Sequence, residues 1–168
     1  AVSNYTAERI EEWLRIADET GVARPVAIQP HYNLVHRNDV EETIVPIAER
    51  ENLSLVPYFA LAKGFLTGKY RSTDASGHDS PRAEGAAVYA TPQGLQIIDT
   101  LERIGSAHDV SIASTALAWL RSQPTVVAPI ASASRLEQVQ GLLDGGRVEL
   151  TADEVAELTR VSTWTPEA

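Results

Sequence analysis

Three largely apolar runs, at residues 26–28, 53–58 and 125–130, constrain the fold of this chain most strongly. They lack the alternation of apolar and polar residues that marks a strand with one face in water, and segments with helical periodicity separate them. Strands that are buried on both faces and joined by helices form parallel sheets. The sequence therefore predicts an α/β fold with a parallel sheet, and residues 1–2 fit the tail of a further strand.

Capping and stop signals predict the helices between these runs. The first is expected to begin after Thr6 and to stop at Gly21, with Trp13 on its apolar stripe and in the core. A second helix, at residues 39–51, is expected to kink or restart at Pro46, which has no N–H for the preceding turn. Two further helices are expected to begin after Thr91 and after Ser111, and another is expected to end at about residue 143. The last helix is expected to begin after the capping box of Thr151 with Glu154.

Residues 63–90 form a long polar stretch with several glycines and a proline. Structureless loops of that length are uncommon inside a domain and usually serve as lids or binding loops. The sequence therefore predicts a long loop here, with a lid over a bound ligand as its function.

Composition and charge exclude several classes of protein. The 168 residues carry a formal net charge of −9, which argues against nucleic-acid binding, because a surface that neutralises phosphates is basic. The absence of cysteine excludes a disulfide scaffold, a thiolate zinc site and a cysteine nucleophile. No apolar run approaches the roughly 18 residues of a membrane helix, so no membrane partner is expected. The length predicts one domain over residues 1–168, while the absence of methionine and the abrupt start at Ala1 favour a piece of a longer protein.

Two histidines invite a metal-site interpretation that their spacing does not support. His31 and His36 stand at positions i and i+5, which matches neither one face of a helix nor one face of a strand. No metal ligand is therefore predicted in this chain.

Polar residues follow the predicted strands at their carboxyl ends. Gln29, Tyr58 and Ser132 each stand at or just after such an end, and Ser3 and Asn4 join them if residues 1–2 are a strand tail. Ligand sites of α/β proteins are built at this edge of a sheet. Taken singly, each residue also has a plain structural interpretation: a turn before a helix, the end of a strand, or a core aromatic.

Four motifs occur in order along the chain, at residues 2–5 (Val-Ser-Asn-Tyr), 29–34 (Gln-Pro-His-Tyr-Asn-Leu), 57–70 (Pro-Tyr-Phe-Ala-Leu-Ala-Lys-Gly-Phe-Leu-Thr-Gly-Lys-Tyr) and 129–138 (Pro-Ile-Ala-Ser-Ala-Ser-Arg-Leu-Glu-Gln). Together they resemble the C-terminal half of the aldo-keto reductases, which are NADPH-dependent carbonyl reductases on a (β/α)₈ barrel. The resemblance extends over essentially the whole chain. It implies the C-terminal portion of a TIM barrel with parallel strands, whose N-terminal half is absent from this chain and would be supplied by the same or a separate chain.

The resemblance also implies an activity and a nicotinamide site. The intact protein would transfer a hydride reversibly between NADPH and a small-molecule aldehyde or ketone, in the cytoplasm. Ser3, Asn4 and Gln29 resemble the residues that hydrogen-bond the nicotinamide carboxamide, a group that needs both donors and acceptors. Tyr58 resembles the aromatic residue that stacks on the nicotinamide ring.

Two further segments resemble the phosphate-binding parts of the family. Residues 61–68 resemble the loop whose backbone amides lie along the pyrophosphate. Residues 132–138 resemble the part that holds the adenosine 2′-phosphate of NADP(H), with Arg135 as its charge partner. The cofactor-binding residues expected in and beside these segments are Phe59, Leu61, Gly64, Leu66, Gly68, Lys69, Ser132, Arg135 and Gln138.

Two positions depart from the family pattern. Ser132 stands where many relatives have glycine, and Leu142 stands where they have an asparagine that contacts adenine. The choice between NADPH and NADH therefore stays open in the sequence. Arg135 also has a second interpretation, in which it pairs with Glu137 on a solvated face.

The catalytic residues of the family have no counterpart here. Its reaction needs a tyrosine acid tuned by a lysine and an aspartate, with a histidine that orients the substrate, all from strands that precede the Ser-Asn motif. The matching residue types of this chain do not occupy those positions, so no catalytic residue is predicted. The alternative function is a non-catalytic nucleotide-binding or scaffold half-barrel without turnover.

Overall fold

A small parallel sheet stands at the centre of the N-terminal part of the chain. The structure is a computed structural model that describes residues 1–72 and 83–163. Strands β1 (Val2–Ser3), β2 (Ala27–Gln29) and β3 (Ser54–Leu55) lie in the order β1-β2-β3, and both pairs are parallel. The α/β fold with a parallel sheet is therefore confirmed, and residues 1–2 do lead into a strand.

Parallel pairing continues beyond the short strands. The N–H of Val56 donates to the carbonyl of Ile28 at 2.9 Å, and the N–H of Tyr58 donates to that of Pro30 at 2.9 Å. His31 and Tyr58 form an isolated parallel bridge. The backbones that follow β2 and β3 are therefore held side by side at the carboxyl edge of the sheet.

The apolar run at residues 125–130 does not form the strand that the sequence predicts. It lies parallel to β3 through a single bridge between Leu55 and Val126, and the N–H of Ile130 donates to the carbonyl of Pro57 at 2.8 Å. Thr125 has a left-handed backbone with φ of 63°, which no regular strand contains. Pro129 has no N–H to add to a ladder. The run is therefore an extended segment and not a strand.

The helices near the sheet follow their capping signals. Helix α1 (Ala7–Thr20) begins with the Thr6 side chain accepting the N–H of Arg9, and it ends at Gly21 with φ of 74°. The second helix divides as expected near Pro46, into the π-helix η1 (Val40–Ile44) and α2 (Val45–Glu51). Because proline removes one hydrogen bond of the preceding turn, the chain widens there before the regular helix begins.

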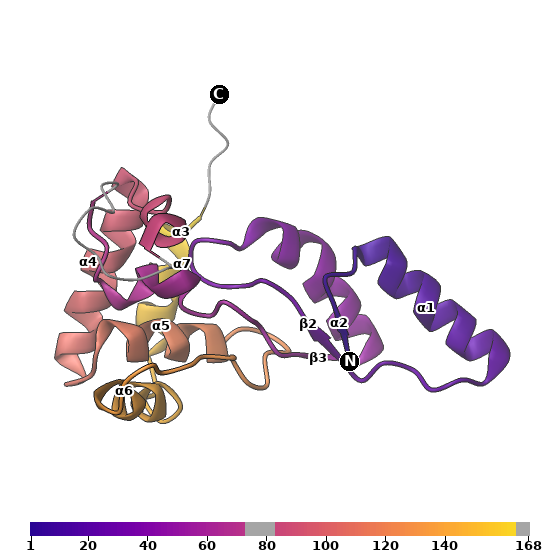
Figure 1. Cartoon of the computed structure of the whole chain (residues 1–168). Coiled ribbons are helices and arrows are strands. Elements are labelled where there is room, and N and C mark those ends of the chain that lie inside the picture. Colours follow the sequence, from indigo (N-terminus) through magenta and orange to yellow (C-terminus); the bar gives the residue numbers. More distant parts are fainter. Residues whose placement is uncertain (73–82, 164–168) are drawn as a thin grey trace.

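The remaining helices gather at the other end of the molecule (Figure 1). Helix α4 (Pro92–Ala107) is capped by Thr91, and α5 (Ile112–Arg121) by Ser111. Helix α6 (Glu137–Gly145) precedes α7 (Ala152–Val161), where Thr151 and Glu154 form the expected capping box. None of the helices within residues 1–72 and 83–163 is long and apolar enough to cross a membrane.

Residues 63–90 are more ordered than the sequence predicts. A 3₁₀ segment, η2 (Ala62–Thr67), opens this stretch, and a short helix, α3 (Ala83–Ala87), follows later. Three alanines of α3 are buried, because small side chains let this helix approach the rest of the core. The expectation of a structureless loop is therefore wrong for these parts. Residues 73–82 lie outside the described residues, and the lid function stays a prediction.

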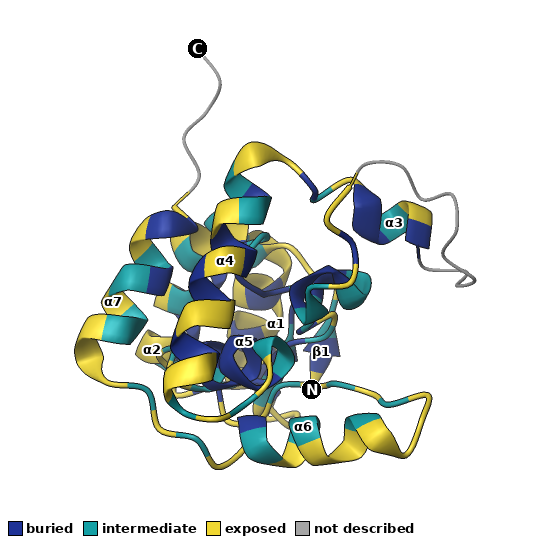
Figure 2. Cartoon of the chain, turned by 90° about the vertical axis from the view of Figure 1, so that its left-hand side faces the viewer, coloured by how far each residue is buried: buried dark blue, intermediate teal, exposed yellow. Residues whose placement is uncertain are grey.

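One hydrophobic core connects the sheet with the C-terminal helices. Ile28 of β2 and Leu55 of β3 belong to the same buried cluster as Leu101 of α4 and Trp119 of α5. Figure 2 shows α5 mostly buried, while α6 mixes exposed and half-buried residues and buries only Gly145. Trp13 differs from the expectation: it is 36 % exposed and packs against Tyr5, with ring centroids 5.9 Å apart.

A buried arginine ties the segment after β2 to the last helix. Arg37 is 9 % exposed, and its Nε and Nη2 donate to both carboxylate oxygens of Glu41 at 2.8 and 2.9 Å. Its Nη1 donates to the carbonyl of Thr159 at 2.6 Å and to the hydroxyl of Ser162 at 2.7 Å. The guanidinium lies over the Trp119 ring, 5.3 Å from the centroid. Every face of this buried charge therefore has a partner.

Replacing Arg37 with alanine is expected to destabilise the protein strongly. The substitution removes the counter-ion of the partly buried Glu41 carboxylate and the donor to the Thr159 carbonyl and the Ser162 hydroxyl, which together should cost about 3 kcal/mol. Chemical denaturation of the complete protein measures the loss. Arg50→Ala is the matched control, since Arg50 pairs with Glu11 and Glu51 on the surface, where water screens the ion pairs and the loss should be much smaller. Equal losses from the two variants would contradict this account.

Candidate functional site

Four of the predicted nicotinamide-binding residues meet at the carboxyl edge of the sheet. Ser3 ends β1 and Gln29 ends β2, and the two are directly opposite in the parallel register. The Ser3 hydroxyl donates to the Gln29 carbonyl at 3.0 Å. Tyr58 follows β3, and its hydroxyl donates to Oδ1 of Asn4 at 2.7 Å. Residues that are far apart in the sequence thus share one small surface.

The bond from Tyr58 orients the Asn4 amide. Asn4 has a left-handed backbone with φ of 58°, a conformation that asparagine tolerates better than most residues. Because Oδ1 of Asn4 accepts from Tyr58, the Nδ2 group is presented as a donor. Gln29 adds a second side-chain amide, which offers both an acceptor and a donor.

A hollow of about 460 Å³ opens beside these residues. Asn4, Gln29 and Tyr58 line it together with residues at the start of α1 and in η1. The hollow therefore combines side-chain amides and aromatic rings with apolar walls, which is the usual composition of a small-molecule site.

His31 and His36 also lie at this edge, stacked on one another. Their ring centroids are 3.9 Å apart at an angle of 10°, and His31 stacks in turn on Tyr58 at 5.5 Å. The spacing i, i+5 did not suggest this contact, because it arises from a tight turn in which Asn33 and His36 form an antiparallel bridge. Within the described residues, no group of three histidine, cysteine, aspartate or glutamate side chains is arranged to hold a metal ion.

The environment of His31 disfavours its charged form. Burial and the neighbouring His36 lower the pKa of His31 to about 4, and Asp39 opposes them only in part. Its Nε2 atom is buried and has no hydrogen-bond partner among the described residues. His31 is therefore a neutral ring at pH 7.

The predicted pyrophosphate loop is a compact, strained turn. Phe59, Ala62 and Lys63 all have left-handed backbones, and Gly64 has φ of 101°. The amides of Ala62, Gly64, Leu66 and Gly68 donate to carbonyls within the loop, at 2.7, 2.8, 3.3 and 3.0 Å. Leu66 is completely buried, backbone included, and the partly buried Leu61 packs against the core. Lys69 is exposed. The contact of this loop with pyrophosphate stays a prediction.

The segment before α6 presents an unpaired arginine. Ser132 and Arg135 are exposed, and among the residues that the structure describes, Arg135 forms no ion pair, so it does not pair with Glu137. Gln138 is engaged locally: its Oε1 accepts the N–H groups of Ser134 and Arg135 at 2.9 and 3.2 Å. The glutamine therefore holds the turn that displays Arg135, and the 2′-phosphate contact stays a prediction.

Sequence reasoning missed Asn33, although it lies within the second motif. Asn33 is completely buried, and its Nδ2 donates to the carbonyl of Phe59 at 2.9 Å. The motif itself was a signal, because a polar side chain between the buried Tyr32 and Leu34 needs hydrogen-bond partners inside the fold. Arg37, three residues after Leu34, was missed in the same way.

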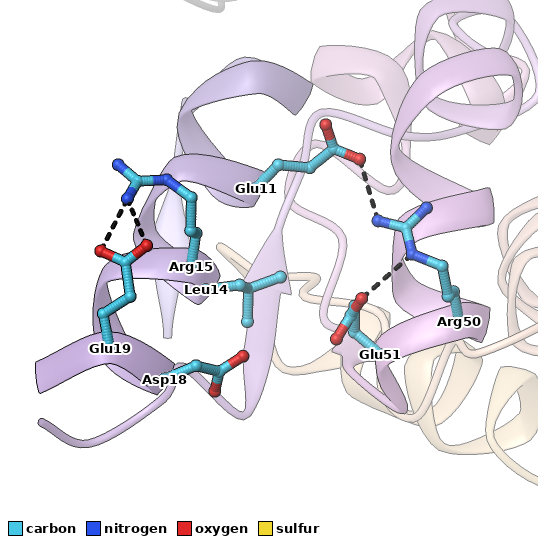
Figure 3. Close-up of a pocket in the computed structure, with 7 residues that line it drawn as sticks. All are labelled: Glu11, Leu14, Arg15, Asp18, Glu19, Arg50 and Glu51. Carbon is cyan, nitrogen blue, oxygen red and sulfur yellow. Dashed lines mark hydrogen bonds and ion pairs between the residues drawn. The ribbon is translucent and has the colours of Figure 1, made fainter. Parts of the chain in front are cut away.

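A second hollow, of about 320 Å³, lies between α1 and α2 (Figure 3). Most of its charged side chains are paired with one another, Arg15 with Glu19 and Arg50 with both Glu11 and Glu51, while Asp18 pairs with Arg24 outside the lining. Both helices end there and lead into β2 and β3, so this hollow lies at the amino edge of the sheet. In βα barrels the residues at the amino edge of the sheet contribute to stability and not to ligand binding. The charged groups of this hollow are already engaged in ion pairs.

Comparison with known proteins gives the family. The model of the aldo/keto reductase family matches residues 1–163. Protein tas of Escherichia coli is 29% identical over 161 residues, which is 95% of this chain and 46% of that protein. An uncharacterized oxidoreductase of Mycobacterium tuberculosis is 38% identical over 162 residues, 94% of this chain and 47% of that protein. A probable voltage-gated potassium channel subunit beta of rice, Oryza sativa, is 30% identical over 141 residues, 82% of this chain and 43% of that protein.

The chain therefore belongs to the aldo/keto reductase family. It spans about half the length of the curated relatives that it matches.

Acidification is expected to destabilise the protein through His31. The folded state lowers the pKa of His31 from 6.5 to about 4, so the unfolded chain binds this proton more readily. The stability that neutral His31 contributes to the folded state is fully present above pH 6.5 and is lost as the pH falls toward 4. Urea denaturation at several pH values measures it. His31→Phe keeps an aromatic ring that does not titrate, and it should reduce the loss of stability over this interval. An unchanged pH dependence in that variant would contradict the assignment.

Proposed function

We propose that this chain is the cofactor-binding part of an NADP(H)-dependent aldo-keto reductase that interconverts an aldehyde or ketone and its alcohol in the cytoplasm. The observation that carries the proposal is the convergence of Asn4, Gln29 and Tyr58 at the carboxyl edge of the parallel sheet. In this proposal the sheet is part of a (β/α)₈ barrel, and its carboxyl edge is where barrel enzymes bind their ligands.

The residues present fit a nicotinamide. A carboxamide needs both a donor and an acceptor, and the Nδ2 of Asn4 together with the Gln29 amide offers them on adjacent strand ends. Tyr58 offers an aromatic face against which a flat ring can lie. The bound cofactor would supply the hydride. The role of these residues is to fix which face of the ring points to the carbonyl carbon, which is a positioning effect.

Positive charge is available for the phosphates. Arg135 is free of ion pairs with the other described residues, and a guanidinium binds phosphate oxygens in a bidentate manner. Lys69 and Lys63 lie in the turn that follows Tyr58. In the proposal Arg135 holds the 2′-phosphate, which favours NADPH over NADH, and the turn at residues 59–68 borders the pyrophosphate.

Proton delivery to the carbonyl oxygen is assigned to other parts of the barrel. Tyr58 hydrogen-bonds Asn4, and Tyr32 is buried, with its pKa raised well above the ordinary value by burial and by the Glu41 carboxylate. Neither suits a general acid. We propose that the remaining strands pack along β1 and along residues 125–130, where Val127 and Ile130 are 60% and 41% exposed. They come from the same chain or from a separate one.

A non-catalytic function is the second candidate. The rice relative bears the name of a probable voltage-gated potassium channel subunit beta, a name that describes no reaction. A measurement of catalytic turnover distinguishes the reductase from the non-catalytic function. Oxidation of NADPH by the complete protein with a panel of aldehydes and ketones supports the reductase, whereas saturable NADPH binding without turnover supports the second candidate.

Loss of the Tyr58 ring is expected to weaken NADPH binding. Aromatic pairs contribute about 0.5–1.5 kcal/mol beyond burial, so Tyr58→Ala should raise the Kd about tenfold. Tyr58→Phe keeps the ring and loses only the bond to Asn4, so its effect should be smaller. Fluorescence titration of the complete protein gives both constants. Unchanged binding in Tyr58→Ala would contradict the stacking role.

Arg135 is expected to determine the preference for the 2′-phosphate. A charge-assisted hydrogen bond contributes about 1.5–3 kcal/mol, so Arg135→Ala should raise the Kd of NADPH at least tenfold. The Kd of NADH, which lacks that phosphate, should not change. Arg147→Ala is the control, since Arg147 is another exposed arginine near α6. If NADPH and NADH weaken equally, the assignment of Arg135 is wrong.

A further inference from the structure

We propose that Asn33 is the positioning residue that holds Tyr58 in place for the nicotinamide ring, an inference that rests on the proposed function. The juxtaposition behind it is a buried side-chain amide that joins the turn after β2 to the strained turn after Tyr58. Asn33 does not touch the cofactor in this proposal and acts only through the backbone of Phe59.

Asn33 is fully buried, and both polar atoms of its side chain are hydrogen-bonded. Its exposed fraction is 0 %, its Nδ2 donates to the Phe59 carbonyl at 2.9 Å, and its Oδ1 accepts the N–H of Val35 at 2.9 Å. Its backbone also pairs with that of His36, at 3.2 and 3.0 Å. The side chain is therefore fixed on its own turn and reaches across to the next one.

Tyr58 is held on both sides by the segment that follows β2. Its own N–H donates to the carbonyl of Pro30 at 2.9 Å, and the carbonyl of the next residue, Phe59, accepts from Asn33. The His31 ring adds a stacking contact with Tyr58 and an edge contact with Phe59, at 5.5 and 5.3 Å between centroids. These contacts determine where the Tyr58 ring lies relative to Asn4 and Gln29.

Phe59 needs this support because its backbone is strained. Its φ of 52° lies in the left-handed region, which non-glycine residues rarely occupy unless the surroundings enforce it. The local bond from the N–H of Ala62 to the same carbonyl, at 2.7 Å, closes the turn but does not connect it to the sheet. The tertiary bond from Asn33 makes that connection.

Only an amide satisfies both partners. The Phe59 carbonyl needs a donor, and the Val35 N–H needs an acceptor. An aspartate has the same shape and keeps the acceptor, yet as a carboxylate it has no hydrogen to donate to the carbonyl. Asn33→Asp therefore removes the bond to Phe59 and retains the bond to Val35.

The test measures two ligands on the complete protein. One is NADPH, and the other is adenosine 2′,5′-bisphosphate, which has the adenosine phosphates but no nicotinamide. We expect Asn33→Asp to raise the Kd of NADPH about tenfold, because the Phe59 carbonyl then keeps only the local bond from the Ala62 N–H and loses the bond that ties its turn to the segment after β2. The Kd of the bisphosphate should stay within about twofold. Asn38→Asp is the matched control: it makes the same chemical change in the same segment, and the Asn38 side chain forms no hydrogen bond among the described residues.

The outcomes separate positioning from folding and from the proposed function. Selective weakening of NADPH in Asn33→Asp, with Asn38→Asp like the natural protein, supports the proposal. Equal weakening of both ligands, or loss of the folded protein, shows a general structural role and overturns it. Unchanged NADPH affinity overturns it as well, while the proposed function stands. If the natural protein binds no NADPH, the proposed function itself fails.

Discussion

The bidentate pair between Arg37 and Glu41 is the interaction on which the rest of the structure depends. A buried guanidinium is tolerated only where polar groups surround it, and here Thr159 of α7 supplies a carbonyl and the C-cap residue Ser162 a hydroxyl. Glu41 also accepts the hydroxyl of Tyr32 at 2.7 Å. This network fixes the segment after β2 against the C-terminal helices, and that segment carries the residues around the candidate site.

Side-chain hydrogen bonds between separate segments also hold the candidate site together at the carboxyl edge of the sheet. Asn33 fixes the turn after Tyr58, and Tyr58 fixes the amide of Asn4. Asn33 joins the segments that leave the neighbouring strands β2 and β3, whereas Tyr58 joins the segments that leave β3 and β1, the two outer strands of the sheet. The geometry of the site therefore follows from the parallel register of the sheet. The strain in Phe59 is sustained by these contacts, and this agrees with the tendency of strained backbones to occur where a ligand must be oriented.

Much of the fold and of the candidate site could be predicted from the sequence, because helix caps and strand ends are marked by local residues. Thr6, Ser111 and Thr151 cap their helices as expected, and Pro46 divides its helix. The meeting of Ser3, Asn4, Gln29 and Tyr58 followed from the rule that parallel strands end at one edge.

The features that sequence reasoning missed depend on tertiary contacts. The stacking of His31 on His36 needs a tight turn that periodicity does not encode, and the buried bonds of Asn33 and Arg37 join segments distant in the chain. Residues 125–130 have the apolar character of a strand, but Thr125 and Pro129 interrupt the ladder. Trp13 lies on an apolar stripe, yet no other described element covers it fully.

The central claim is that the carboxyl edge of the sheet binds the nicotinamide end of NADP(H). The most direct measurement is an amide NMR titration of the complete protein with NADPH. Nicotinamide binding at this edge should give saturable shifts of the side-chain amides of Asn4 and Gln29 and of the Phe59 N–H. The amides of Glu11 and Glu51, in the hollow between α1 and α2, should stay unchanged. Shifts confined to the residues of that hollow, or no saturable shifts at all, would contradict nicotinamide binding at the carboxyl edge.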